Sequence, residues 1–266
     1  MKQRFNGVTS GLIGLALALQ VILPVDDASA KAASAQDVHE IADMCMYSQR
    51  ILKDYALIGM KVTYHDPATD LKENTKKIDK YIANLESHHL KKSLDDDIRE
   101  LEALWKEIEP KLLEKPSQKR MTMLHKKVEK FSHRCEEVAE DLAEDSRIKG
   151  EHNVVLIAKL GMESQRLAAL YMMKAWGVAD DNYYENVEEI LQEYKKIYQE
   201  LMNADDKLVS PEIKAKLKSA EKHFLVFEFM AASKSGRFVP TMAEKSATKI
   251  FIKVREILKL EEKLIE

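Results

Sequence analysis

The fold is decided by two matching stretches of the chain, IADMCMYSQR at residues 41–50 and IAKLGMESQR at residues 157–166. Both begin with Ile-Ala and share the pattern Met-x-Ser-Gln-Arg, which we call the box. Shifting the sequence by the 116 positions that separate Met46 from Met162 also aligns apolar residues far from the box. The aligned pairs include Val38 with Val154, Tyr55 with Tyr171, and Leu142 with Leu258. This match indicates an internal duplication with a repeat of about 115 residues, the size of one domain.

The residues around each box follow a helical period. Apolar positions recur at alternating spacings of three and four, which predicts a helix with a single buried seam. Capping side chains and prolines predict further helix starts at Asp66-Pro67, Ser93, Ser117, Ser210-Pro211 and Pro240. No strand pattern interrupts these segments. The sequence therefore predicts an all-α protein of two tandem antiparallel four-helix bundles, over residues 36–150 and 151–266.

The N-terminus predicts export. Lys2 and Arg4 precede an apolar run over residues 11–25, and Ala28-Ser29-Ala30 follows it. This pattern is typical of a secretory signal peptide over residues 1–30, with cleavage after Ala30. The alternative is an uncleaved anchor, which would be the only contact with the membrane. Either interpretation places the remainder in the periplasm.

Composition and motifs exclude several classes of function. A net charge of −3 over 266 residues gives no basic face for nucleic acid. The sequence contains no Cys-x-x-Cys-His, no His-Glu-x-x-His, no Gly-rich phosphate loop and no Gly-x-Ser-x-Gly turn. We therefore expect a protein that is not an enzyme and that carries no cofactor.

The two cysteines, Cys45 and Cys135, fall on the buried seams of the first and fourth helices of the first predicted bundle. At about 1.5 Å rise per residue, both lie roughly 12 Å from the same end of that bundle. Export would place them where disulfides persist, so a structural disulfide is predicted. The alternatives are two buried free thiols, or a soft metal site with Met44, Met46 and His133. Adjacent helix residues point about 100° apart, which argues against the metal site.

The box supports two interpretations. In the first, Ser48 and Ser164 bond to the carbonyl one turn earlier, while Arg50 and Arg166 pair with acids on a neighbouring helix. In the second, Ser48, Gln49, Arg50, Ser164, Gln165 and Arg166 are ligand-binding residues. A guanidinium with amide and hydroxyl neighbours suits the recognition of a planar oxyanion.

The two boxes resemble a known family of sensors. They are similar to the N-terminal sensor domain of type IV pilus methyl-accepting chemotaxis proteins, the PilJ type, and to the periplasmic nitrate/nitrite sensor domain of the NarX type. That family's first helix carries a box close to Ala-Gly-Arg-x-Arg-Met-Leu-Ser-Gln-Arg, and both stretches match its second half.

The resemblance implies four-helix sensory modules in the periplasm that bind a small anion, commonly at a dimer interface. In the nitrate-sensing members, the arginine directly before the box methionine holds the anion. Cys45 and Gly161 occupy that position here, and Asp43 and Lys159 replace the family's first arginine. Arg50 and Arg166 are the arginines that carry over.

The expected function follows from these observations. We expect an exported, sensor-like protein without its own output domain that binds a small ligand, such as an anion, or an envelope or receptor protein. A second copy of the chain is a further candidate partner. The alternative is a structural or interaction module of the envelope without a small-molecule ligand. Apolar residues of the second copy indicate either a docking surface or the interface between the bundles, namely Phe224, Val226, Phe227, Phe229 and Met230.

Overall fold

The computed structural model describes residues 31–178 and 181–265, with side chains to Glu261, so the predicted signal peptide lies outside the described residues. Apart from one isolated bridge between Lys31 and Leu90, the regular structure of this part is helical, which confirms the all-α prediction. The helices are α1 (Ala35–Gly59), α2 (Pro67–Ser87), α3 (Lys92–Leu112), α4 (Gln118–Ser146), α5 (Glu151–Ala175), α6 (Tyr183–Asn203), α7 (Pro211–Ala231) and α8 (Pro240–Ile265).

Most of the predicted helix starts are confirmed. The side chains of Asp66, Ser117 and Ser210 each accept a hydrogen bond from a backbone N–H in the first turn of α2, α4 and α7. The start predicted at Ser93 was wrong, because α3 begins at Lys92 and no side chain caps it. Asp95 acts from inside that helix, where its Oδ1 accepts the Leu90 N–H at 3.1 Å.

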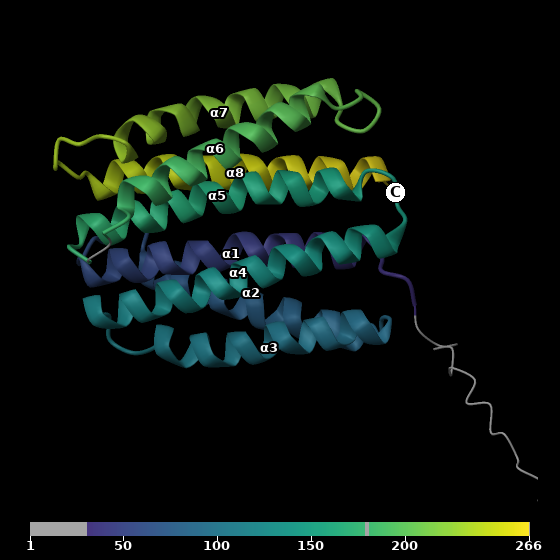
Figure 1. Cartoon of the computed structure of the whole chain (residues 1–266), viewed down its shortest axis with the longest axis horizontal. Coiled ribbons are helices and arrows are strands. Elements are labelled where there is room, and N and C mark those ends of the chain that lie inside the picture. Colours follow the sequence, from purple (N-terminus) through teal and green to yellow (C-terminus); the bar gives the residue numbers. More distant parts are fainter. Residues whose placement is uncertain (1–30, 179–180, 266) are drawn as a thin grey trace, which may run out of the picture.

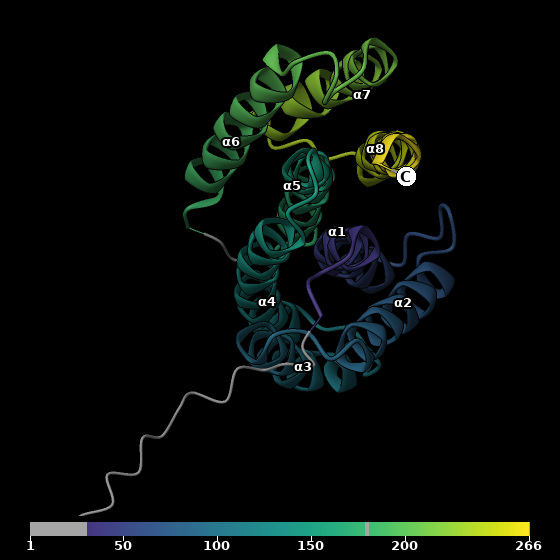
Figure 2. The same cartoon turned by 90° about the vertical axis from the view of Figure 1, so that its right-hand side faces the viewer.

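The helices form two groups that meet at the centre of the molecule. Helix α1 packs against α2 and α4, and α3 packs against α4; helix α5 likewise packs against α6 and α8, and α7 against α8. Helices α1 and α5 also pack on each other, with α4 and α8 beside them (Figure 1). Seen end-on, α2 and α3 lie on one side of this centre and α6 and α7 lie on the other (Figure 2). Within the described residues, no helix is both long and apolar enough to cross a membrane.

Helices α1 and α5 run parallel to each other. Met46 lies against Gly161, where an added Cβ would come within 2.4 Å of the Met46 Sδ. Near the other end of the pair, an added Cβ on Gly59 would come within 2.1 Å of the Trp176 ring. The two boxes therefore lie side by side, and a side chain at Gly161 or Gly59 would have to displace Met46 or Trp176.

Helix α1 is buried on every face along its second half. All residues from Met44 to Leu57 are buried, including the charged Arg50, Lys53 and Asp54. The prediction of a single buried seam was therefore incomplete, because α5 and α8 cover the faces that α2 and α4 leave open. A helix covered all round is ordinarily apolar all round, so each buried polar group of α1 requires a partner.

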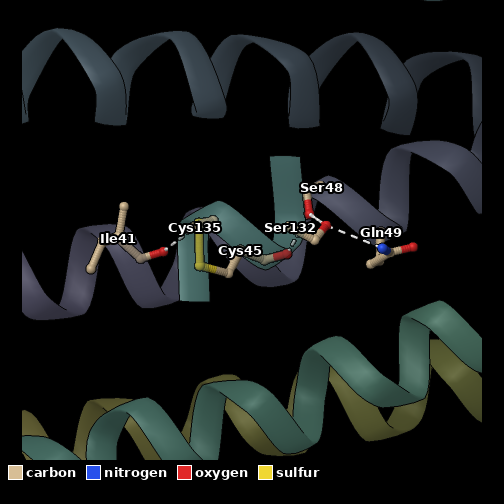
Figure 3. Close-up of a disulfide and its surroundings, with 6 residues drawn as sticks. All are labelled: Ile41, Cys45, Ser48, Gln49, Ser132 and Cys135. Atoms are coloured by element: carbon tan, nitrogen blue, oxygen red, sulfur yellow. Dashed lines mark hydrogen bonds between the residues drawn. A yellow bond between two sulfur atoms is a disulfide. The ribbon is translucent and has the colours of Figure 1, made fainter. Parts of the chain in front are cut away.

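The predicted disulfide between Cys45 and Cys135 is confirmed, and it joins α1 to α4 (Figure 3). The described residues contain no free cysteine, which removes the free-thiol and soft-metal interpretations. About one helical turn away, the Ser48 and Ser132 hydroxyls lie 2.6 Å apart across the same two helices. A disulfide fits an oxidising compartment.

The apolar residues of α7 serve two purposes. Phe224 and Phe227 are buried in the core, where Phe224 stacks on Tyr194 and Phe227 packs against Tyr171. Phe229 is 80% exposed and Val226 is 51% exposed. The apolar residues predicted to form either a docking surface or the interface between the bundles are therefore divided between the core and the surface. Helix α7 packs against α8, α6 and α5.

Reduction of the disulfide should destabilise the protein without changing its helix content. The bond closes a loop of 90 residues, for which chain entropy predicts a loss of about 4.6 kcal/mol in the free energy of unfolding. Urea denaturation of oxidised and reduced protein, followed by circular dichroism, measures this difference. A Cys45→Ala/Cys135→Ala variant should match the reduced protein within about 1 kcal/mol. Detection of free thiols in unfolded, unreduced protein would contradict the assignment.

Candidate functional site: a polar groove between α4, α5 and α6

The serines of both boxes lie in the core and bond to their own helices. The Ser48 hydroxyl donates to the Cys45 carbonyl at 2.6 Å, and the Ser164 hydroxyl donates to the Gly161 carbonyl at 2.7 Å. Both serines are fully buried. These contacts are the ones expected from the structural interpretation of the box.

The first box arginine joins three helices. Arg50 of α1 donates to Asp70 of α2 at 2.8 Å and to Thr248 of α8 at 3.3 Å. Its guanidinium also lies 4.5 Å from the ring centroid of Phe251 on α8. Arg50 is 6% exposed, so it is engaged in the contact between the two groups of helices.

A second set of buried charges lies one turn further along α1. The ammonium of Lys53 pairs with Asp54 at 2.7 Å and with Glu244 of α8. Asn74 of α2 donates to the other Asp54 oxygen at 3.1 Å, and Thr248 donates to the other Glu244 oxygen at 2.7 Å. This network ties α1 and α2 to α8 through charge-assisted hydrogen bonds.

Three carboxylates of this region are close enough together to hold a metal ion. Oxygens of Asp54, Asp70 and Glu244 lie within 4.8 Å of one another. However, Lys53 and Arg50 already pair with all three, so two fixed cations occupy the place that a metal ion would need. The geometry is that of an internal ion network.

The second box faces a different set of partners. Arg166 of α5 donates to one carboxylate oxygen of Glu129 on α4, with its Nε at 2.9 Å and its second terminal nitrogen at 2.8 Å. The other Glu129 oxygen accepts a hydrogen bond from Gln49 of α1 at 2.8 Å. Glu129 therefore links the glutamine of the first box to the arginine of the second.

These residues line a groove of about 820 Å³. Helices α4, α5 and α6 supply most of its lining, and Gln49 of α1 contributes to it. Its acidic residues are Glu100, Glu129, Glu136, Glu137, Glu163, Glu189 and Glu193. Its basic residues are Lys130, Arg134, Lys159, Arg166 and Lys196, together with His133. Seven carboxylates against five strong cations make the groove negative when all are ionised.

Glu163 is the most deeply buried acid of the groove. It is 2% exposed, and within the described residues its Oε2 accepts no hydrogen bond, although Arg166 lies 3.7 Å away. Burial raises the pKa of Glu163 to about 8, against the attraction of Arg166 and with added repulsion from Glu136. Glu163 is therefore largely protonated at neutral pH.

Lys159 of α5 links α4 and α6 at the same groove through two ion pairs. Its ammonium lies 3.0 Å from Glu136 of α4 and 3.1 Å from Glu193 of α6. Burial alone would lower the pKa of Lys159, but these two carboxylates raise it. Lys159 and Arg166 are thus two fixed cations among five nearby carboxylates, which are Glu129, Glu136, Glu163, Glu189 and Glu193.

The position of the first group that corresponds to Glu163 is filled by an aromatic side chain, although a separate cavity of about 490 Å³ lies between α1, α2 and α8. The offset that aligns the boxes pairs Glu163 with Tyr47. Tyr47 is fully buried against Phe251, with ring centroids 5.3 Å apart, and Lys77 lies 4.6 Å from the Tyr47 ring. Tyr47 thus packs edge to face against Phe251, whereas the aligned Glu163 lines an acidic groove.

The position that would carry the nitrate-binding arginine of the resembling family is apolar here. Cys45 is in the disulfide, and Gly161 lies against Met46 and Val254. Met46 is fully buried. Packing therefore fills the centre of the α1–α5 contact at this level, so no charged group is available there to hold an anion.

The structure divides the six box residues proposed as ligand contacts. Gln49 and Arg166 line the groove, while Ser48, Arg50, Ser164 and Gln165 do not. Gln165 is buried and donates to the Ala247 carbonyl at 3.0 Å. The sequence reasoning missed Glu129, Glu163 and Lys159. The available signal was the variable position of the box, which is Tyr47 in one copy and Glu163 in the other.

No family model matches this chain, and no curated protein or solved structure matches it. The function is accordingly argued from the groove and its residues.

Replacement of Lys53 by methionine should destabilise the protein strongly. It would leave Asp54 and Glu244 buried without their cation, which typically costs about 3–5 kcal/mol. Chemical denaturation measures the change. A Lys53→Met/Glu244→Gln variant should recover part of the loss, because the amide still accepts from Thr248 and one negative charge is gone. A double variant that loses the sum of the two single effects would contradict this pairing.

Glu163→Gln should reduce the pH dependence of stability. The raised pKa means that the folded protein holds a proton that the unfolded chain has lost between about pH 4.5 and 8. Stability from this group therefore falls as pH rises through that window, by at most about 1.4 kcal/mol per pH unit. Denaturation of both proteins at pH 5, 6, 7 and 8 measures this slope.

The matched control is Glu73→Gln, at the position aligned with Glu189 and exposed on α2. Its stability should follow the wild-type pH profile. Parallel profiles for wild type and Glu163→Gln would show that Glu163 is ionised in the folded protein and would contradict its assigned state.

Proposed function

We propose that this chain is an exported, non-enzymatic, sensor-like protein that binds a small ligand in the groove between α4, α5 and α6. The observation that carries the proposal is that both boxes contact Glu129. Its carboxylate accepts hydrogen bonds from Gln49 of the first box and from Arg166 of the second. The contact places residues of both repeated stretches on the wall of one cavity.

The same proposal includes the architecture and the compartment. We interpret α1–α4 and α5–α8 as two tandem four-helix bundles derived from a duplication, of the PilJ and NarX sensor type. The matching boxes and the parallel contact of α1 with α5 support this interpretation. The signal-like N-terminus and the disulfide support export to the periplasm.

The second candidate function is an interaction module of the cell envelope. An exposed apolar surface favours it, formed by the end of α7 and the start of α8. Its residues are Leu225, Val226, Phe229, Val239 and Met242, which line a shallow cavity of about 540 Å³. Exposed apolar patches of this kind often mark contact surfaces.

Thermal unfolding with a panel of small charged solutes, including nitrate and nitrite, tests the proposed function. A ligand at 100 times its dissociation constant should stabilise the folded protein by about 2.7 kcal/mol, which gives a clear rise in Tm. The ligand-induced rise in Tm should differ from that of the wild type in Arg166→Ala, because Arg166 lines the groove. It should be unchanged in Glu73→Gln, because Glu73 lies outside the groove. If no solute raises Tm, ligand binding fails, and the interaction module becomes the better account.

A further inference from the structure

The groove contains more buried acceptors than the protein itself satisfies. Within the described residues, neither Gln49 Oε1 nor Glu163 Oε2 accepts a hydrogen bond, and both atoms are shielded from solvent. Gln49 directs its amide nitrogen to Glu129 and Ser132, at 2.8 and 3.1 Å, so its oxygen is the end that lacks a donor. A buried acceptor without a donor destabilises the folded protein, so a ligand rich in donors would relieve that cost on binding.

The charge around these acceptors favours a cation. Five carboxylates surround Lys159 and Arg166 in the inner part of the groove, on α4, α5 and α6. Counted over the whole lining, six ionised carboxylates face five lysine and arginine side chains when Glu163 is protonated, so the groove keeps a net negative charge. An anion entering here would meet a net negative potential, and the arginine that it would need is already held by Glu129.

The spacing of the carboxylates favours an organic cation over a metal ion. Among the described residues, the one group of three His, Cys, Asp or Glu ligand atoms within 4.8 Å of one another is at Asp54, Asp70 and Glu244, outside the groove. The acids of the groove are instead spread around 820 Å³, with Lys159 and Arg166 between them. An ion with a short coordination radius cannot reach several of them together, whereas a chain with separated ammonium groups can.

We propose that the groove binds an organic amine of the diamine or polyamine class, with one ammonium group donating to Glu163 and Gln49 and another near Glu189 and Glu193. An ammonium group has three donors and no acceptor, which matches oxygens that accept no hydrogen bond from the protein. This inference rests on the proposed function, because it names the ligand class of the same groove.

Amine binding is coupled to a proton. The groups facing Glu163 are Arg166 and Lys159 on α5, Glu129 and Glu136 on α4, and Glu189 and Glu193 on α6. A bound ammonium adds a positive charge to this set and favours the ionised carboxylate. Binding should therefore release a proton from Glu163 and tighten as pH rises from 6 to 8.

Isothermal titration of the full chain with 1,4-diaminobutane and with spermidine tests the proposal. Saturable binding is expected at constant ionic strength, and 1,4-butanediol, the uncharged analogue, should not bind. Glu189→Gln should weaken binding about threefold, because it removes an exposed carboxylate near the site. Glu73→Gln, which makes the same charge change on α2, should leave the affinity unchanged.

Arg166→Gln separates the amine from an anion. Removing this cation should tighten amine binding about fivefold, whereas an anion bound by the same arginine would be lost. Lys159→Gln should also tighten amine binding, and it replaces Arg166→Gln in the test if that variant does not fold. In Glu163→Gln, the rise of amine affinity between pH 6 and 8 should disappear.

Several outcomes overturn the inference. They are the absence of amine binding, equal weakening by Glu189→Gln and Glu73→Gln, or weaker amine binding in Arg166→Gln. If nitrate or another anion raises Tm and Arg166→Ala abolishes the rise, the inference fails while the proposed function stands. If neither amines nor anions bind, both fail.

Discussion

The structure depends on the burial of two parallel helices against each other. Helices α1 and α5 are covered by α2, α4, α6 and α8, so water does not reach most of their polar groups. Gly161 leaves room for this contact, because a side chain there would displace Met46 and Val254. Burial then requires a partner for each charge, because an isolated buried charge would destabilise the fold by several kcal/mol. The ion networks of α1 are the consequence of its central position.

The two sides of this central pair meet that requirement differently. On the α2 and α8 side, Arg50 and Lys53 are matched by carboxylates on both neighbours, and Phe251 and Tyr47 fill the remaining space. On the α4 and α6 side, the aligned position carries Glu163 in place of an aromatic ring. A carboxyl group is smaller than a phenol ring and cannot replace its packing, so space and unsatisfied acceptors remain together. This difference distinguishes the acidic groove from the region around α1, α2 and α8, where the cavity is smaller.

Helix content, most helix starts and the disulfide could be predicted from the sequence, because each depends on local signals. Periodicity marks the helices, Ser and Asp mark the caps, and the placement of Cys45 and Cys135 on two seams marks the bond. The groove could not be predicted in the same way. It depends on Glu129 of α4 meeting Arg166 of α5, a contact between the two groups of helices that no periodicity within either group reports. The box was recognised as unusual, but its residues could not be assigned to the core or to the groove until the packing of α1 on α5 was known.

The disulfide also has a consequence for the groove. It fixes α1 against α4 one turn from the pair of Ser48 and Ser132, and Gln49 donates to that same Ser132 (Figure 3). Glu129 lies one turn before Ser132 on α4, and its carboxylate accepts hydrogen bonds from Gln49 and Arg166. A covalent bond at this place holds α4 in register with α1, and hence holds Glu129 where both boxes reach it. Preorganisation of this kind would lower the entropy cost of the proposed ligand binding, because a ligand would not need to order the wall of the groove. The second group of helices has no corresponding bond, since Gly161 and Phe251 take the places of the cysteines, and there aromatic packing holds α8 against α1.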